Sequence, residues 1–102
     1  MSSSPVAIVT GAGTGIGRAV MLALVSAGYR VGAAGRNGER LRQVLADAGL
    51  GPDQALAIAT DITDPDSVKA LFTEVKERYG RLDLLFNNAG IGAPPVPLEE
   101  PV

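Results

Sequence analysis

A glycine-rich segment at residues 10–18 constrains the fold more than any other part of the sequence. It follows the continuous apolar run 6–9, which is typical of a strand buried on both faces. It precedes residues 16–27, whose apolar spacing predicts a helix. Neither the G-x-G-x-x-G spacing nor the P-loop pattern fits this segment. Its glycines permit a sharp turn, a close backbone approach to a diphosphate and close packing of helix on strand; they are Gly11, Gly15 and Gly17.

The rest of the chain continues this alternation of strand and helix. Further strands are predicted at 30–35, 55–60 and 82–86. The first helix should end at Gly28, which suits the left-handed conformation. Its expected inward stripe is Ile16, Ala19, Val20, Ala23, Leu24 and Ala27.

Cap residues predict where the other two helices begin and end. The second helix is expected to start after Asn37 and to stop at Gly49, and the third to start at the pair 64–65, an aspartate cap followed by proline. Gly80 should close the third helix. The inward residues predicted for the second helix are Leu41, Val44, Leu45 and Ala48. Those predicted for the third helix are Val68, Leu71, Phe72, Val75 and Tyr79.

The resulting order βαβαβαβ predicts an α/β fold with a doubly wound parallel sheet. Right-handed helical crossovers join parallel strands, which gives the strand order 3-2-1-4 with the first strand near the centre. Sheets of this kind bind their ligands at the carboxyl ends of the strands. Candidate binding residues are therefore sought immediately after each strand.

Composition excludes several other classes of function. A net charge of −2 provides no broad positive field for nucleic acid. The chain has no cysteine and no histidine, so it lacks thiol chemistry, the commonest general base and the commonest transition-metal ligands, and no metal site is expected. Because neither a signal peptide nor a run long enough to span a membrane is visible, the expected location is cytoplasmic.

Three motifs, each placed after a predicted strand, resemble those of the short-chain dehydrogenase/reductase family. They are Thr10-Gly-x-x-x-Gly15-x-Gly17, then Asp61-Ile62, then Asn87-Asn88-Ala89-Gly90. The resemblance extends to about Gly92, and it implies a Rossmann-type half-domain over 1–92, followed by a proline-rich tail at 93–102. The function it implies is oxidoreduction of a carbonyl/alcohol pair with a nicotinamide dinucleotide.

By the same resemblance, cofactor roles fall on individual residues. Gly11, Gly15, Ile16 and Gly17 would line the diphosphate. Asp61 would accept a hydrogen bond from the adenine amino group, with Ile62 beside the ring. Asn87, Ala89 and Gly90 would lie along the adenosine ribose, whereas Asn88 would brace the sheet.

The end of the second strand favours NADP(H) over NAD(H). An acidic residue there would bond the ribose hydroxyls and repel a 2′-phosphate, but this chain has Gly35 followed by Arg36. Arginine is a permanently charged, planar partner for phosphate. Asn37 and Thr14 are further candidates for phosphate contacts.

The catalytic residues that the resemblance implies are not found in these 102 residues. No Tyr-x-x-x-Lys motif is present, and no serine stands where the family's catalytic serine would be, so the chain alone is predicted to be inactive. Three interpretations follow: the cofactor-binding half of an enzyme, a non-catalytic nucleotide-binding module, or a piece completed by a partner chain. The fourth strand is expected to be an open edge that permits self-association or pairing with such a partner. Substrate, reaction direction and oligomeric state stay open.

Overall fold

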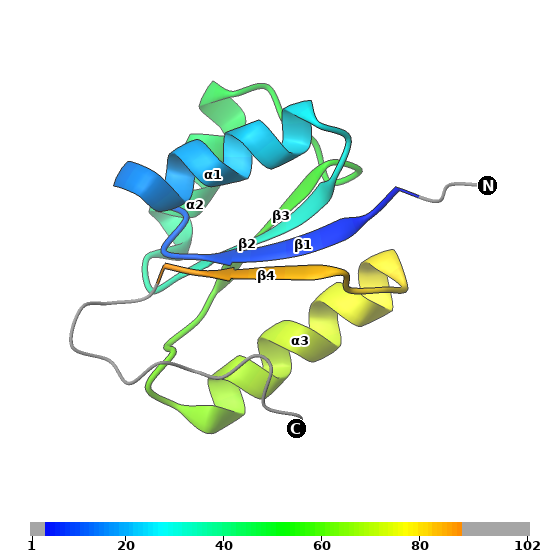
Figure 1. Cartoon of the computed structure of the whole chain (residues 1–102). Coiled ribbons are helices and arrows are strands. Elements are labelled where there is room, and N and C mark those ends of the chain that lie inside the picture. Colours follow the sequence, from blue (N-terminus) through cyan, green and yellow to red (C-terminus); the bar gives the residue numbers. More distant parts are fainter. Residues whose placement is uncertain (1–3, 89–102) are drawn as a thin grey trace.

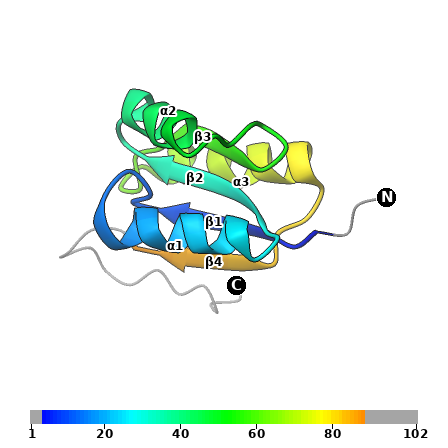
Figure 2. The same cartoon turned by 90° about the horizontal axis from the view of Figure 1, so that it is seen from above.

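The computed structural model describes residues 4–88, in which four strands and three helices alternate in the predicted order. The strands are parallel and their order is β3-β2-β1-β4, which confirms the predicted topology (Figures 1 and 2). Ala89, Gly90 and the tail 93–102 lie outside the described residues. The elements are β1 (Val6–Thr10), α1 (Gly15–Ser26), β2 (Arg30–Gly35), α2 (Gly38–Asp47), β3 (Ala55–Ala59), α3 (Pro65–Tyr79) and β4 (Leu84–Asn87).

The sheet forms the middle of three layers. Helices α1 and α2 cover one face and α3 covers the other, as Figure 1 shows. Each face has its own apolar cluster, one containing Val9, Met21 and Leu41 and the other containing Ile8 and Leu71. All five residues of β1 are buried, as expected of a strand covered on both faces.

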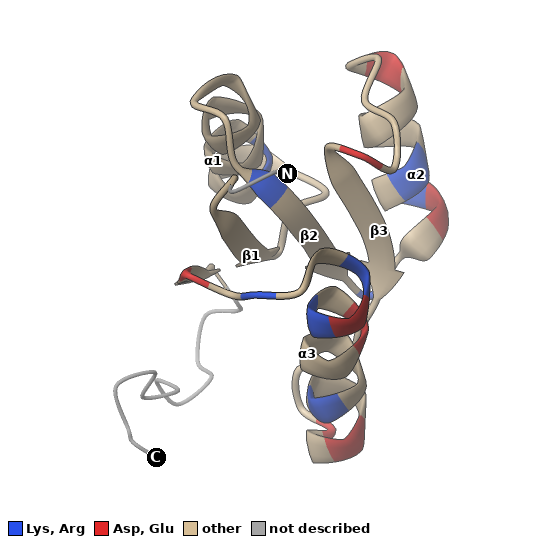
Figure 3. Ribbon diagram, turned by 90° about the vertical axis from the view of Figure 1, so that its right-hand side faces the viewer, with Lys and Arg blue, Asp and Glu red and all other residues tan. Residues whose placement is uncertain are grey.

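The predicted inward stripe of α1 is wrong in part. Ile16 is 67% exposed, and Ala19, Ala23 and Ala27 are exposed as well. The buried residues of the helix are Gly17 and Met21, whereas Val20 and Leu24 of the predicted stripe are partly buried. The physical reason is that α1 has a single charged residue, Arg18, so its periodicity hardly distinguishes one face from another (Figure 3).

Caps and glycines fix α2 and α3 as predicted. The Oδ1 atom of Asn37 accepts a hydrogen bond from the backbone N–H of Arg40 at 3.0 Å, and Asp64 caps α3 through the N–H of Asp66. The glycines that end the three helices all have positive φ, which only glycine adopts easily; they are Gly28, Gly49 and Gly80. One inward residue was wrong: Ala48 is exposed, because it is the C-cap of α2 and lies beyond the last turn that packs.

Strand β4 lies at one edge of the described sheet and pairs there only with β1. Leu84 is 40% exposed, and a shallow groove beside it is lined by Phe72, Leu82 and Leu85. Self-association through this edge stays a prediction. Within residues 4–88, no helix combines the length and the hydropathy needed to cross a bilayer.

Candidate functional site

The sequence-predicted site residues that the structure describes gather at the carboxyl edge of the sheet. Strands β1, β2, β3 and β4 run parallel, so the segments that follow them emerge at the same edge. These segments are the glycine turn, the β2–α2 loop, the β3–α3 loop and the residues after β4 (Figure 1). Topology therefore brings together groups that lie far apart in the sequence, such as Thr10 and Asn87, 77 positions apart.

The glycine turn requires glycine at three positions for different reasons. Gly11 and Gly15 have φ values of +67° and +56°, in the left-handed region that L side chains rarely adopt. Gly17 has ordinary φ, but a Cβ atom there would lie 2.0 Å from the carbonyl oxygen of Gly11. The first turn of α1 thus packs directly on the backbone that leaves β1. This close approach is what the sequence spacing predicted.

The N-terminus of α1 presents backbone N–H groups toward the carboxyl edge. The first helical hydrogen bond runs from the N–H of Arg18 to the carbonyl of Thr14 at 3.3 Å, so the N–H groups of residues 15–17 precede the helical ladder. The side chain of Thr14 makes no capping hydrogen bond, and the first turn holds no acidic residue. Amides that precede the helical ladder, at the positive end of a helix dipole, suit an anion.

Hydrogen bonds from Thr10 join the turn to the end of β4. The Thr10 hydroxyl donates to Asn87 Oδ1 at 2.9 Å and accepts from the backbone N–H of Asn88 at 2.9 Å. The Nδ2 atom of Asn88 lies beneath the turn, 3.0 Å from the position a Cβ atom would take on Gly17. Asn88 therefore lies where a bracing residue would be. Ala89 and Gly90 of the same motif are outside the described residues.

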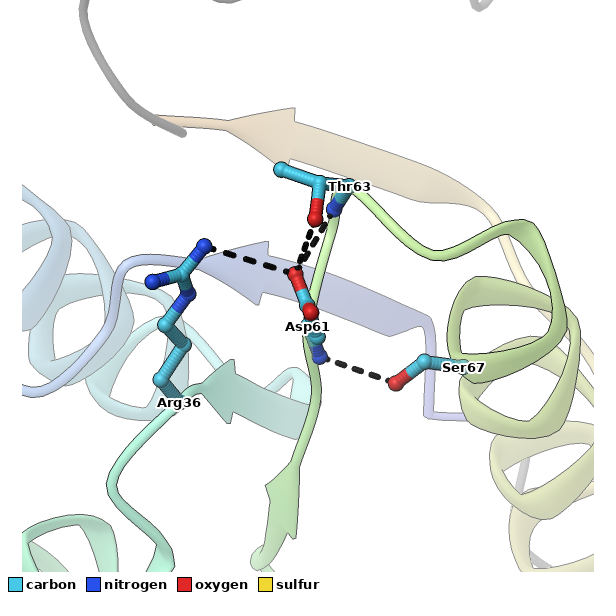
Figure 4. Close-up of polar contacts among 4 residues, drawn as sticks. All are labelled: Arg36, Asp61, Thr63 and Ser67. Atoms are coloured by element: carbon cyan, nitrogen blue, oxygen red, sulfur yellow. Dashed lines mark hydrogen bonds and ion pairs between the residues drawn. The ribbon is translucent and has the colours of Figure 1, made fainter.

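Asp61 has a structural task in the turn ahead of α3. Its Oδ1 atom accepts hydrogen bonds from the backbone N–H of Thr63 at 2.9 Å and from the Thr63 hydroxyl at 2.6 Å (Figure 4). These two bonds, and to a smaller extent Arg36, hold the pKa of the Asp61 carboxyl below its usual value of 3.8. Its backbone N–H donates to Ser67 Oγ at 2.8 Å, which anchors the loop on α3. The spacing of aspartate and threonine two residues apart was the available signal, since aspartate commonly bonds the backbone two residues on.

Arg36 directly follows β2 and Asp61 lies in the segment after β3, and their side chains face each other at the carboxyl edge. The Arg36 Nη2 atom lies 3.5 Å from Asp61 Oδ1, with the two side chains 72% and 47% exposed (Figure 4). An exposed, single-contact ion pair of this length contributes little to stability. The guanidinium is therefore accessible to another anion. The Oδ1 atom of Asn37, the neighbouring candidate, accepts the hydrogen bond that caps α2.

Arg40 also reaches this edge and was not anticipated. Its Nε atom donates to the carbonyl oxygen of Gly13 at 3.3 Å, which links α2 to the glycine turn. Nothing in the sequence marked it, because an arginine in the first turn of an amphipathic helix is usually a solvated charge. As for metal ligands, the structure of residues 4–88 contains no group of three or more acidic side chains that could hold an ion.

Comparison with known proteins shows which family this fold and site belong to. The short chain dehydrogenase family model matches residues 5–101, and the chain belongs to that family. A 3beta-hydroxysteroid dehydrogenase of Mediterraneibacter gnavus is 45% identical over 84 residues, which make up 82% of this chain and 30% of that protein. A 3-oxoacyl-[acyl-carrier-protein] reductase of Staphylococcus aureus is 40% identical over 93 residues, 89% of this chain and 37% of that protein.

Solved structures give the same result. A short chain dehydrogenase/reductase from Burkholderia phymatum in complex with NAD matches with a TM-score of 0.78 and 35% identity, over 88% of this chain and 32% of that one. A 3-ketoacyl-(acyl-carrier-protein) reductase from Brucella melitensis complexed with NADH matches with a TM-score of 0.78 and 33% identity, over 94% of this chain and 38% of that one. The chain therefore spans about a third of the length of these relatives and corresponds to their cofactor-binding part.

Proposed function

We propose that this chain is the NADP(H)-binding portion of a short-chain oxidoreductase that acts on a carbonyl/alcohol pair. The observation that carries the proposal is the glycine turn, where Gly17 packs on the Gly11 carbonyl and the amides of 15–17 precede the helical ladder. That arrangement fits a diphosphate, because it combines N–H donors with the positive end of the α1 dipole. A bound nicotinamide would supply hydride transfer.

The remaining cofactor contacts follow from the strand ends. Asp61 uses Oδ1 for Thr63 and Arg36, so its second carboxylate oxygen is the acceptor for an adenine amino group, with Ile62 beside the ring. Asn87, together with Ala89 and Gly90 beyond the described residues, is proposed to follow the adenosine ribose. Thr14, exposed and without a capping bond, is proposed to contact phosphate.

The preference for NADP(H) over NAD(H) rests on Gly35 and Arg36. No carboxylate stands at position 35 to repel a 2′-phosphate, and the guanidinium next to it is 72% exposed. Replacing its 3.5 Å contact with Asp61 by a phosphate costs little, because that contact is long and solvated. A bidentate arginine–phosphate pair is shorter and stronger.

Calorimetric titration of the 102-residue chain with NADP⁺ and NAD⁺ tests both parts of the proposal. We expect saturable binding of both dinucleotides, with NADP⁺ tighter. In Arg36→Ala the affinity for NADP⁺ should fall by about tenfold or more, since a hydrogen bond to a charged group contributes about 1.5–3 kcal/mol. NAD⁺ affinity should hardly change. If neither dinucleotide binds, the cofactor proposal is overturned. Equal affinities of the wild-type chain for NADP⁺ and NAD⁺ would overturn only the proposed preference for NADP⁺.

Catalysis by the chain alone is not expected. The sequence has no Tyr-x-x-x-Lys motif, and its two lysines, Lys69 and Lys76, lie on α3. Under this proposal the chain binds NADPH but does not oxidise it in the presence of a panel of ketones and aldehydes. Such oxidation above the protein-free rate would show that a catalytic set exists in these residues. Binding without turnover is also what a nucleotide-binding module would give.

A further inference from the structure

Arg40 is a link between two segments that are separated by β2. It lies in the first turn of α2, and its Nε atom donates to the Gly13 carbonyl 27 positions earlier. The side-chain stem follows the same path: its Cδ and Cγ atoms lie 3.5 and 3.7 Å from the position a Cβ atom would take on Gly13. Both packing and a hydrogen bond therefore attach α2 to the glycine turn.

The position of Arg40 is fixed by the start of α2. Its backbone N–H is the donor that Asn37 Oδ1 accepts at 3.0 Å, which defines Arg40 as the third residue of the helix. Side chains on a helix tilt toward its N-terminus, and here that direction leads to the carboxyl edge of the sheet. The neighbouring Leu41 is buried in the apolar cluster on the same face of the sheet, so this side of α2 packs inward.

The turn has few other attachments at this point. The N–H of Ala12 donates to the Ala34 carbonyl at 3.1 Å, and Gly17 packs on Gly11 on the other side. Between these anchors, the Arg40 Nε–H is the one side-chain donor that reaches Gly13 or Thr14 within residues 4–88; the other donor there is the backbone N–H of Arg18 in the adjoining α1. The amides that follow at 15–17 depend on how this stretch is held.

We propose that Arg40 is a positioning residue that holds the glycine turn in the bend that aims its amides at the diphosphate. This inference rests on the proposed function. The dinucleotide diphosphate is common to NADP⁺ and NAD⁺, so Arg40 acts on both cofactors alike. Arg36, by contrast, acts on the 2′-phosphate that only NADP⁺ carries. The ratio of the two affinities therefore separates positioning from phosphate contact.

The test compares Arg40→Ala with Arg40→Lys and with Arg42→Ala, the matched control. Arg42 is an exposed arginine of the same helix, so its removal changes the net charge by the same amount. Lysine keeps the charge but lacks the Nε–H donor. Three properties are measured: affinity for NADP⁺ and NAD⁺ by calorimetry, hydrogen exchange without ligand of the bonded amides of Ala12 and Arg18 on either side of Gly13, and the urea midpoint of unfolding.

Arg40→Ala and Arg40→Lys should both weaken NADP⁺ and NAD⁺ binding by about threefold, as expected for one exposed hydrogen bond. Exchange at the Ala12 and Arg18 amides should quicken by a similar factor, with the urea midpoint unchanged, and Arg42→Ala should match the wild type. The proposal is overturned if only the affinity for NADP⁺ falls, or if Arg40→Lys behaves like the wild type. It is also overturned if amide hydrogen exchange is unchanged. If the wild-type chain binds neither dinucleotide, the cofactor proposal fails, and the exchange experiment still decides whether Arg40 holds the turn.

Discussion

The two edges of the sheet are built on opposite principles. At the amino edge, where the strands begin, charged and aromatic side chains are paired with one another and with backbone groups. At the carboxyl edge, where the strands end, the amides of residues 15–17 precede the helical ladder and the guanidinium of Arg36 is 72% exposed. We call the amino edge closed, because its polar groups are paired, and the carboxyl edge open, because donors there are available to a ligand.

Pairing at the amino edge is dense. Asp83 accepts hydrogen bonds from the Val6 backbone N–H at 2.8 Å and from two guanidinium nitrogens of Arg81, each at 2.9 Å. The Tyr79 hydroxyl donates to the Pro52 carbonyl at 2.8 Å, and Arg30 lies over the Tyr79 ring at 5.5 Å. The Arg81–Asp83 pair lies within the α3–β4 loop, whereas the other contacts join a strand end or helix end to another segment.

At the carboxyl edge the comparable ion pair is a single contact of 3.5 Å between Arg36 and Asp61. Short bonds there stay within loops or bind strand ends together, as between Thr10 and Asn87. Polar groups left without short partners lose little when a ligand binds, because no strong internal bond must break first. The difference teaches that the donors available to a ligand, the amides of 15–17 and the weakly paired Arg36 guanidinium, lie at the carboxyl edge.

The largest effect is expected from Gly17→Ala at the open edge. The added Cβ would collide with the Gly11 carbonyl, which belongs to rigid backbone, and overpacking of this kind costs about 3 kcal/mol. Dinucleotide binding should be lost because the turn must move. Urea denaturation and calorimetry measure the two losses, with Gly51→Ala as control, since a Cβ atom there meets open space. A stable variant that still binds would show that the close approach is not needed for the site.

A smaller effect is expected from Tyr79→Phe at the closed edge. Losing the hydrogen bond to Pro52 should lower the free energy of unfolding by about 1 kcal/mol and leave dinucleotide affinity unchanged. Burial raises the pKa of the Tyr79 hydroxyl to about 12. The unfolded chain therefore releases this proton first, and wild-type stability should fall as the pH rises from about 10 toward 12.

Denaturation at a series of alkaline pH values checks this prediction, and the phenylalanine variant should show a flatter profile. Altered cofactor affinity in Tyr79→Phe would break the separation of the two edges. If the stability of the two proteins falls equally with rising pH, Tyr79 is not the cause of the loss of stability at alkaline pH.

The smallest effect is expected from Asp83→Asn, also at the closed edge. The Arg81 guanidinium, and after it the Val6 N–H, hold the pKa of the Asp83 carboxyl below 3.8. A lowered folded-state pKa stabilises the fold above the unfolded value, and this contribution is lost as the pH falls through the folded value. The wild-type chain should lose stability below about pH 4, and the variant should lose less over the same interval. This loss is measured as the urea midpoint of unfolding between neutral pH and about pH 3. The same decrease in the wild type and the variant would contradict the prediction.

Much of the fold followed from local sequence signals. The caps Asn37 and Asp64 and the closing glycines set helix limits, because each acts through bonds within a few residues of itself. The strand order followed from chain order and the handedness of crossovers. The carboxyl-edge location of the site followed in turn, because parallel strands end at one edge.

Other features could not be predicted because they depend on the approach of distant backbone. The inward face of α1 was wrong at Ile16 since an apolar helix with one charge has no preferred face, and the contact of Gly17 with Gly11 decided it. The bond of Arg40 to Gly13, 27 positions earlier, was likewise missed, whereas the bonds of Asp61 to Thr63 are local and had a sequence signal. Residues 89–90 of the third motif lie beyond the described structure, so their roles stay predictions.

The sequence by itself determined the order of elements, their limits and the edge at which binding groups collect, since caps, glycines and apolar periodicity act over one or two turns. Only the tertiary structure decided which face of α1 is buried, that Arg36 meets Asp61 and which side chain reaches the glycine turn. Those outcomes depend on contacts between segments brought together by the sheet, and no local pattern encodes a distance across it.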